Sequence, residues 1–150
     1  MTPETLRMPF REVRFKTEDG VVLRGWHVQQ SVGGERSKRT VVLCAPFNHD
    51  KSTMLGISRA LWEGGMSTLL FDFRSHSPMA VERSIGHLER RDARAAVAWA
   101  EKNCCRDGEH LAIVGASMGG AMALCAAEER ARAGKPFVAV ATDCAFASLM

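Results

Sequence analysis

The sequence lacks several features that would assign it at once to a class of protein. No apolar run approaches the roughly 20 residues that a membrane-spanning helix needs. The first residues, Met-Thr-Pro-Glu-Thr-Leu-Arg, contain no apolar stretch typical of a signal peptide. There is no internal repeat and no low-complexity segment, and 46% of the residues are hydrophobic, which excludes a disordered chain. We therefore expect a single cytoplasmic domain over residues 1–150 that does not bind membranes.

Signatures of metal, nucleotide and nucleic-acid binding are also missing. The five cysteines show neither Cys-x-x-Cys nor Cys/His ligand spacing, and we interpret Cys44, Cys125 and Cys144 as small buried residues with reduced thiols. The glycines at 115–120 are not followed by the Lys-Ser/Thr of a phosphate-binding loop. The net charge of +3 is scattered along the chain, which argues against a nucleic-acid partner. We expect no metal or other cofactor, and the sequence indicates no particular oligomeric state.

The most informative stretch runs from residue 110 to residue 127. An apolar segment, Leu111 to Val114, leads into Gly115-Ala116-Ser117-Met118-Gly119 and then into small helix-forming residues. This order predicts a strand buried on both faces, a sharp turn and a helix. The pattern G-x-S-x-G is that of a nucleophile elbow, in which glycine avoids a steric clash in a tight turn. We predict that Ser117 is a nucleophile and that the backbone N–H of Met118 stabilises an oxyanion.

A simpler structure fits the same five residues. The turn could be an ordinary glycine-rich loop in which the serine caps the helix that follows. The context favours the elbow, because a strand-like run precedes the serine and no glycine or proline follows Gly120 before residue 133.

Hydrophobic periodicity and turn residues predict the other elements. Strands are expected at 10–17, 21–28, 40–45, 67–73 and 137–142, and helices from 52 or 53, from 85 and from 118, with a surface loop at 31–39. This order predicts an α/β fold, with a doubly wound, mostly parallel sheet preceded by an antiparallel hairpin. Ligands bind at the carboxyl ends of such strands, where Ser117 and the loops at 46–51 and 74–84 would meet.

With these motifs, the chain resembles the N-terminal half of an α/β-hydrolase of the bacterial esterase and peptidase-like branch. The resemblance covers roughly residues 10 to 149 and rests on the elbow, on Thr17-Glu18-Asp19-Gly20 and on Asp72-Phe73-Arg74. It implies an incomplete α/β-hydrolase domain that stops after the sixth strand. The loop after the third strand supplies a second oxyanion amide in this family, and by position that amide belongs to Phe47.

The resemblance implies a serine hydrolase that acts on an ester, thioester or amide of a small-molecule acyl substrate. In the family order, the acid and the histidine of the triad follow the serine, and here they would come after residue 150. We therefore expect feeble activity from these 150 residues. All five histidines precede Ser117; His49 and His76 lie in loops that could approach it, and Asp143 occupies the place where a minority of this fold carries its acid.

Two other functions fit the same residues. One is a binding or scaffold protein that keeps the sheet but lacks catalytic activity, which the missing acid and base would suggest. The other is an acyltransferase, because related folds also move acyl groups to acceptors other than water. A product assay with competing acceptors distinguishes the transferase from the hydrolase.

Overall fold

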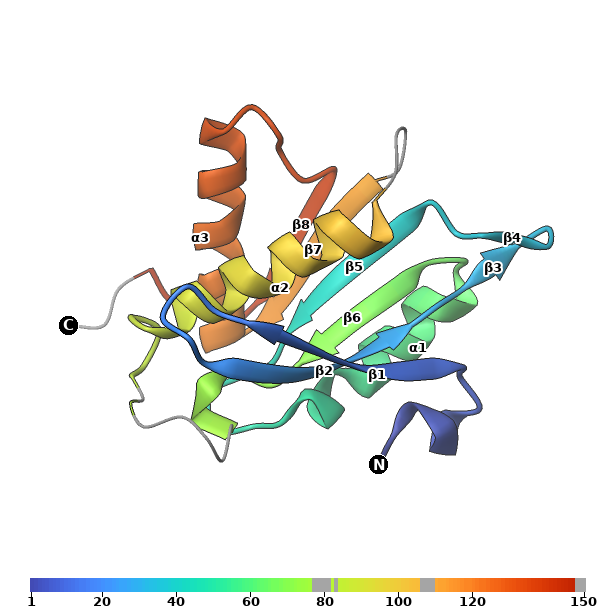
Figure 1. The fold of residues 1–150 in the computed structure, drawn as a ribbon, viewed down its shortest axis with the longest axis horizontal. Helices are drawn as coiled ribbons and strands as arrows, with labels where there is room; N and C mark the ends of the chain where they lie inside the picture. The colour runs from blue at the N-terminus through green and yellow to red at the C-terminus, as the bar shows by residue number, and fades with distance from the viewer. Residues whose placement is uncertain (77–81, 83, 106–109, 148–150) are drawn as a thin grey trace.

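A six-stranded sheet forms the centre of the computed structural model, which describes residues 1–76, 82, 84–105 and 110–147. The strand order is β1-β2-β6-β5-β7-β8 (Figure 1). Neighbouring strands from β6 to β8 run parallel, whereas β1 and β2 form the predicted antiparallel hairpin and β2 pairs antiparallel with β6. The strands are β1 (Phe10–Lys16), β2 (Val22–Val28), β5 (Arg39–Cys44), β6 (Ser67–Phe71), β7 (His110–Ala116) and β8 (Ala139–Asp143). The predicted fold class is confirmed.

The helices lie on both faces of this sheet. One core cluster joins the sheet to α2 and α3, and a second joins the opposite face to α1; Figure 1 shows α2 and α3 apart from α1. Short 3-10 turns precede or connect these elements. The helical elements are η1 (Pro3–Leu6), η2 (Lys51–Met54), α1 (Leu55–Glu63), η3 (Arg74–His76), α2 (Glu89–Cys104) and α3 (Met118–Arg132).

The central strands β5 and β6 are buried on both faces, as their apolar sequences predict. Burial of β7 alternates instead: Leu111 and Ile113 are buried, whereas Ala112 and Val114 are only half-buried. The prediction of burial on both faces is therefore wrong for β7. Next to it, β8 is exposed along its whole length and pairs with β7 alone among the described strands.

Several predicted boundaries differ from the structure. The helix expected from Ile85 begins at Glu89, because the Glu89 carboxylate accepts hydrogen bonds from the backbone N–H groups of Ser84 and Gly86 and holds that segment in turns. The helix expected at 52 or 53 is preceded by the 3-10 turn η2. The expected loop at 31–39 contains a small hairpin, β3 (Ser31–Val32) with β4 (Glu35–Arg36). The last strand is shifted toward the C-terminus, and much of the loop at 74–84 lies outside the described residues.

The cysteine assignments are only partly correct. Cys44 is buried as predicted, but Cys125 is half-buried and Cys144 is exposed. The other fully buried cysteine is Cys104 at the end of α2, whose Sγ lies 3.5 Å from Nε2 of His27. In the described part of the chain, no helix is long and apolar enough to cross a bilayer.

His27 on β2 is a buried histidine that the sequence analysis did not identify. Only 3% of the residue is exposed, and its Nδ1 has no hydrogen-bond partner among the described residues. Its ring packs edge-on against Trp99 of α2, with 5.6 Å between the ring centroids. Burial, assisted by the charges of Arg11 and Arg36, lowers the pKa of His27 from 6.5 to about 4.

We expect the protein to lose stability as the pH falls from about 6.5 to about 4, where His27 takes up a proton only in the unfolded chain. The loss should reach roughly 3 kcal/mol, at about 1.4 kcal/mol for each pKa unit. His27→Phe should remove this part of the pH dependence, measured by urea unfolding at a series of pH values. His110→Gln, at an exposed histidine, is the control. Equal pH slopes for wild type and His27→Phe would contradict the prediction.

Candidate active site

Ser117 connects β7 to α3 through a backbone conformation that residues other than glycine rarely adopt. Its φ is 51° and its ψ is −118°, and a positive φ strains an L residue. The Ser117 N–H donates a hydrogen bond to the carbonyl of Asp143 at 2.8 Å, and its own carbonyl accepts one from the N–H of Ala121 at 3.1 Å. Both the end of β8 and the first turn of α3 therefore hold the strained residue in place.

The Ser117 side chain makes no capping hydrogen bond to α3. A capping serine stabilises a helix by accepting a hydrogen bond from one of the first free backbone N–H groups. Without that bond, the strain at Ser117 has no compensation from capping. The geometry therefore disfavours the simpler alternative of a capped turn, and the residue is partly exposed at the turn.

The two glycines of the motif are required for different steric reasons. A Cβ on Gly115 would lie 2.2 Å from the carbonyl oxygen of Gly119, which is the clash across the turn that the sequence predicts. A Cβ on Gly119 would instead lie 2.2 Å from the carbonyl oxygen of Cys44 and 2.5 Å from that of Ala45. Gly119 thus brings the first turn of α3 against the end of β5, a contact that the sequence pattern did not reveal.

The candidate oxyanion amides lie on the two sides of this contact. Met118 is the first residue of α3, so its N–H belongs to the group of amides that a helix leaves without an internal partner. Phe47 lies in the loop after β5, within a turn in which the N–H of His49 bonds the carbonyl of Pro46 at 3.3 Å. Their roles as oxyanion donors stay predictions.

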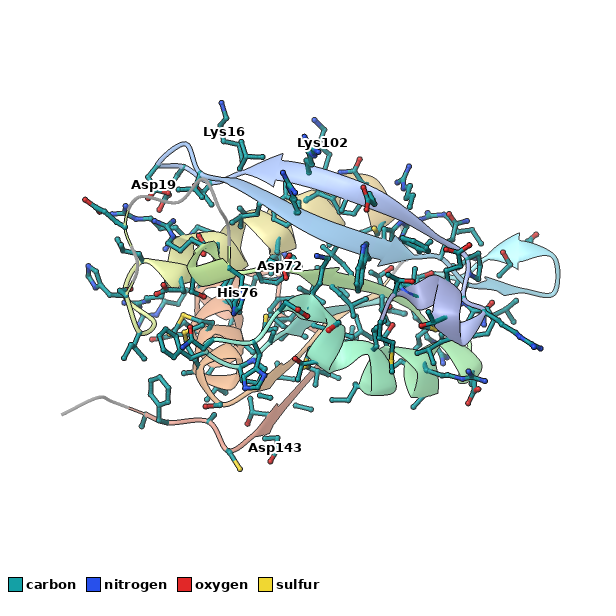
Figure 2. The ribbon with its side chains drawn as sticks, turned by 90° about the horizontal axis from the view of Figure 1, so that it is seen from below. Lys16, Asp19, Asp72, His76, Lys102 and Asp143 are labelled. Atoms are coloured by element: carbon teal, nitrogen blue, oxygen red, sulfur yellow. The ribbon has the colours of Figure 1, made fainter. Side chains whose placement is uncertain are left out.

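The described residues do not assemble a triad around Ser117. No hydrogen bond joins any of the five histidines to Ser117 within residues 1–76, 82, 84–105 and 110–147. Hydrogen bonds from Ser52 lower the pKa of Asp50, and the charges of Lys51 and His76 lower it further. Asp143 accepts a hydrogen bond from Sγ of Cys144 at 3.3 Å. Figure 2 shows the Asp143 side chain at the margin of the domain, away from His76.

A buried charge cluster centres on Arg74, the first residue of η3. Its guanidinium is 1% exposed and donates to Asp92 of α2 at 2.8 and 2.9 Å and to Asp19 of the β1-β2 turn at 2.8 and 3.0 Å. These hydrogen bonds hold the pKa of Asp19 well below its usual range, while burial raises the pKa of Asp92. The cluster ties the hairpin to α2 and to the end of β6.

In the sequence, Asp19 and Arg74 belong to two separate motifs, and neither motif indicates that the two residues pair. A second pair that the sequence analysis missed joins Lys51 to Asp72, with 2.6 Å between Nζ and Oδ2. Both pairs link residues that are far apart in the chain. The motifs themselves were the available signal, but a pairing across elements follows only from the sheet order.

Comparison with known proteins supports the fold. The model of the prolyl oligopeptidase family matches residues 78–150. A solved esterase of Pyrococcus furiosus is 26% identical, with a TM-score of 0.81 over 97% of this chain and 52% of that chain. The chain belongs to the α/β-hydrolase superfamily. This α/β-hydrolase chain therefore matches about half the length of that esterase.

Two sequence relatives match most of this chain. An uncharacterized protein of Mycobacterium tuberculosis is 34% identical over 120 residues, which are 80% of this chain and 42% of that protein. The polyketide transferase grgF of a Penicillium species is 32% identical over 136 residues, which are 85% of this chain and 42% of that protein. The α/β-hydrolase chain thus spans less than half the length of these two relatives.

Proposed function

We propose that Ser117 is the nucleophile of a cytoplasmic serine hydrolase that cleaves an ester, thioester or amide of a small-molecule acyl substrate. The observation that carries this proposal is the strained, uncapped serine at the first turn of α3. Strain that the surroundings maintain is typical of functional positions. The helix N-terminus adds backbone N–H donors and a positive dipole end beside the serine, both of which favour a developing oxyanion.

The proposed reaction has two steps. Oγ of Ser117 attacks the acyl carbonyl carbon, loses its proton to a base and forms a tetrahedral oxyanion next to the N–H groups of Met118 and Phe47. The bond to the leaving oxygen, sulfur or nitrogen then breaks, and the leaving group takes up a proton. Water attacks the acyl-enzyme in the same way, which releases the carboxylic acid and returns the proton to Ser117.

The described residues include the proposed nucleophile and the proposed oxyanion donors, but no base is hydrogen-bonded to Ser117 among them. Removal of a triad member from a serine hydrolase lowers the rate by several powers of ten, and the oxyanion hole with substrate binding retains a residual rate. We therefore expect these 150 residues by themselves to acylate slowly, and the base and acid to come from outside the residues described.

A fluorophosphonate probe tests the nucleophile. We expect mass spectrometry of the purified chain to find the probe on the peptide that carries Ser117. Ser117→Ala should abolish that label, and Ser31→Ala in the remote β3-β4 hairpin should not. The same probe in a lysate of the source organism reports the mass of the natural protein that carries this peptide. A folded chain that reacts equally with and without Ser117 would overturn the proposal.

A second candidate is transfer of the acyl group to an acceptor other than water. The similarity to a polyketide transferase favours it, because both reactions share the same acyl-enzyme. Product analysis with an activated ester and a competing alcohol or amine distinguishes the two. A new ester or amide in excess over free acid would identify a transferase.

A further inference from the structure

Lys51 and Asp72 join the loop that carries Phe47 to the carboxyl end of β6. Oδ1 of Asp72 accepts the backbone N–H of Lys51 at 2.8 Å, and Oδ2 accepts the Lys51 ammonium at 2.6 Å. The side chains of both residues are only 14% exposed, and Nζ also lies 4.4 Å from the centre of the Trp26 ring. A single carboxylate therefore holds both the backbone and the side chain of Lys51.

The opposite end of this loop is held just as closely. The carbonyls of Cys44 and Ala45 touch Gly119, where a single added carbon would overlap them. Between the two anchors lie only residues 46–50. Their turn contains Asn48 at a φ of 60°, a conformation that costs energy for a residue other than glycine. We infer that the turn keeps its shape because both of its ends are held.

We propose that Asp72 is a positioning residue that acts through Lys51 to hold the backbone N–H of Phe47 toward the oxyanion. This inference rests on the proposed function of Ser117 and assigns a role to the Asp72-Phe73-Arg74 motif, which the nucleophile and the oxyanion amides leave unused. A displacement of about 1 Å at a reacting group can lower a rate about 100-fold. The partly desolvated, charge-assisted bonds of Asp72 are of the kind that can prevent such a displacement.

Two substitutions remove the anchor in different ways. Asp72→Asn leaves one acceptor oxygen, which can serve the backbone N–H or the ammonium of Lys51 but not both. Lys51→Met keeps an apolar side chain of similar length against Trp26 and removes the ammonium. Glu63→Gln is the matched control, because it removes a carboxylate from an exposed ion pair with Arg59 in α1, away from the loop.

The measurement is the rate of Ser117 labelling at increasing fluorophosphonate concentration, which separates probe binding from the maximal rate of phosphonylation. We expect Asp72→Asn and Lys51→Met each to lower the maximal rate about 10- to 100-fold, because loss of one oxyanion donor typically costs about 100-fold or more. Probe binding should stay unchanged. The double variant should be no slower than the slower single variant, and Glu63→Gln should match wild type.

The outcomes separate this inference from the proposed function. If wild type is labelled at Ser117 and both anchor variants reach the maximal rate of wild type, the role of Asp72 is overturned but the proposed function is not. Reductions that multiply in the double variant, or that appear only in probe binding, overturn it as well. Wild type without any label at Ser117 overturns the proposed function and this inference with it. If Asp72→Asn fails to fold by circular dichroism, the maximal rate of Lys51→Met decides.

Discussion

Arg74→Met is expected to lower the free energy of unfolding by about 3–5 kcal/mol. The substitution leaves the carboxylate of Asp92, which is 0% exposed, buried without a cation. It also removes the two hydrogen bonds that Arg74 donates to Asp19. A buried charge that loses its partner cannot recover its hydration, so the penalty greatly exceeds the value of an ion pair in water. Unfolding by guanidinium chloride, monitored by circular dichroism, measures this change in the free energy of unfolding.

Arg94→Gln is the matched control for this prediction. Arg94 also binds two carboxylates, those of Glu129 at 2.8 Å and Glu18 at 2.6 Å, but its side chain is 46% exposed. Water and salt screen such a pair, so we expect a loss below about 1 kcal/mol. Adding Asp92→Asn to Arg74→Met should restore part of the stability, because the unpaired charge disappears. A loss for Arg74→Met no larger than for Arg94→Gln would show that the cluster is not the source of stability.

Gly119→Ala is expected to destabilise the protein by about 3 kcal/mol or more, at the upper end of the cost of overpacking. The new Cβ would meet the carbonyls of Cys44 and Ala45, at distances of 2.2 and 2.5 Å. These atoms belong to the backbone at the end of β5, so no side-chain rotation can relieve the overlap. Either the first turn of α3, which carries the N–H of Met118, or the end of β5, which leads into the loop of Phe47, must move. Thermal unfolding measures the loss, and fluorophosphonate labelling of Ser117 should slow in parallel.

Gly56→Ala makes the same chemical change where there is room for it. Gly56 lies in α1, and nothing is found within 4 Å of a Cβ added there. Alanine favours the helix over glycine by about 0.5–1 kcal/mol, so this variant should be more stable than wild type. If Gly119→Ala lowers the stability and Gly56→Ala raises it, packing against β5, and not the loss of a glycine as such, decides the effect of the substitution. A neutral Gly119→Ala would mean that the contact with β5 can relax.

Local patterns in the sequence were sufficient for the types of the main strands and helices, but not for the small β3-β4 hairpin. Continuous apolar runs predicted β5 and β6, because strands covered by helices on both faces need apolar side chains at every position. The change from a strand-like run to small residues predicted the turn between β7 and α3. Boundaries were less predictable. The start of α2 depends on where the Glu89 carboxylate finds its donors, and the apolar spacing from Ile85 carries no information about that.

The candidate site, too, could be predicted only in part from the sequence. The motif pointed to Ser117 and its two glycines, since a tight turn imposes local steric demands that five residues can satisfy and display. The strained φ without a capping bond, the contact of Gly119 with β5 and the clamp of Asp72 on Lys51 could not be read in this way. The last two of these features join residues that the chain separates by 21 positions or more.

By itself, the sequence determined the order of the main strands and helices and the serine at the turn, because these follow from periodicity and from the steric limits of neighbouring residues. The hydrolase resemblance came from motifs that the chain shares with a known family. Only the tertiary structure decided which charges meet at Arg74, which end of β5 touches α3 and how the loop of Phe47 is held. The physical reason is that ion pairs and backbone contacts between distant segments depend on the order and register of the strands, which no local pattern encodes.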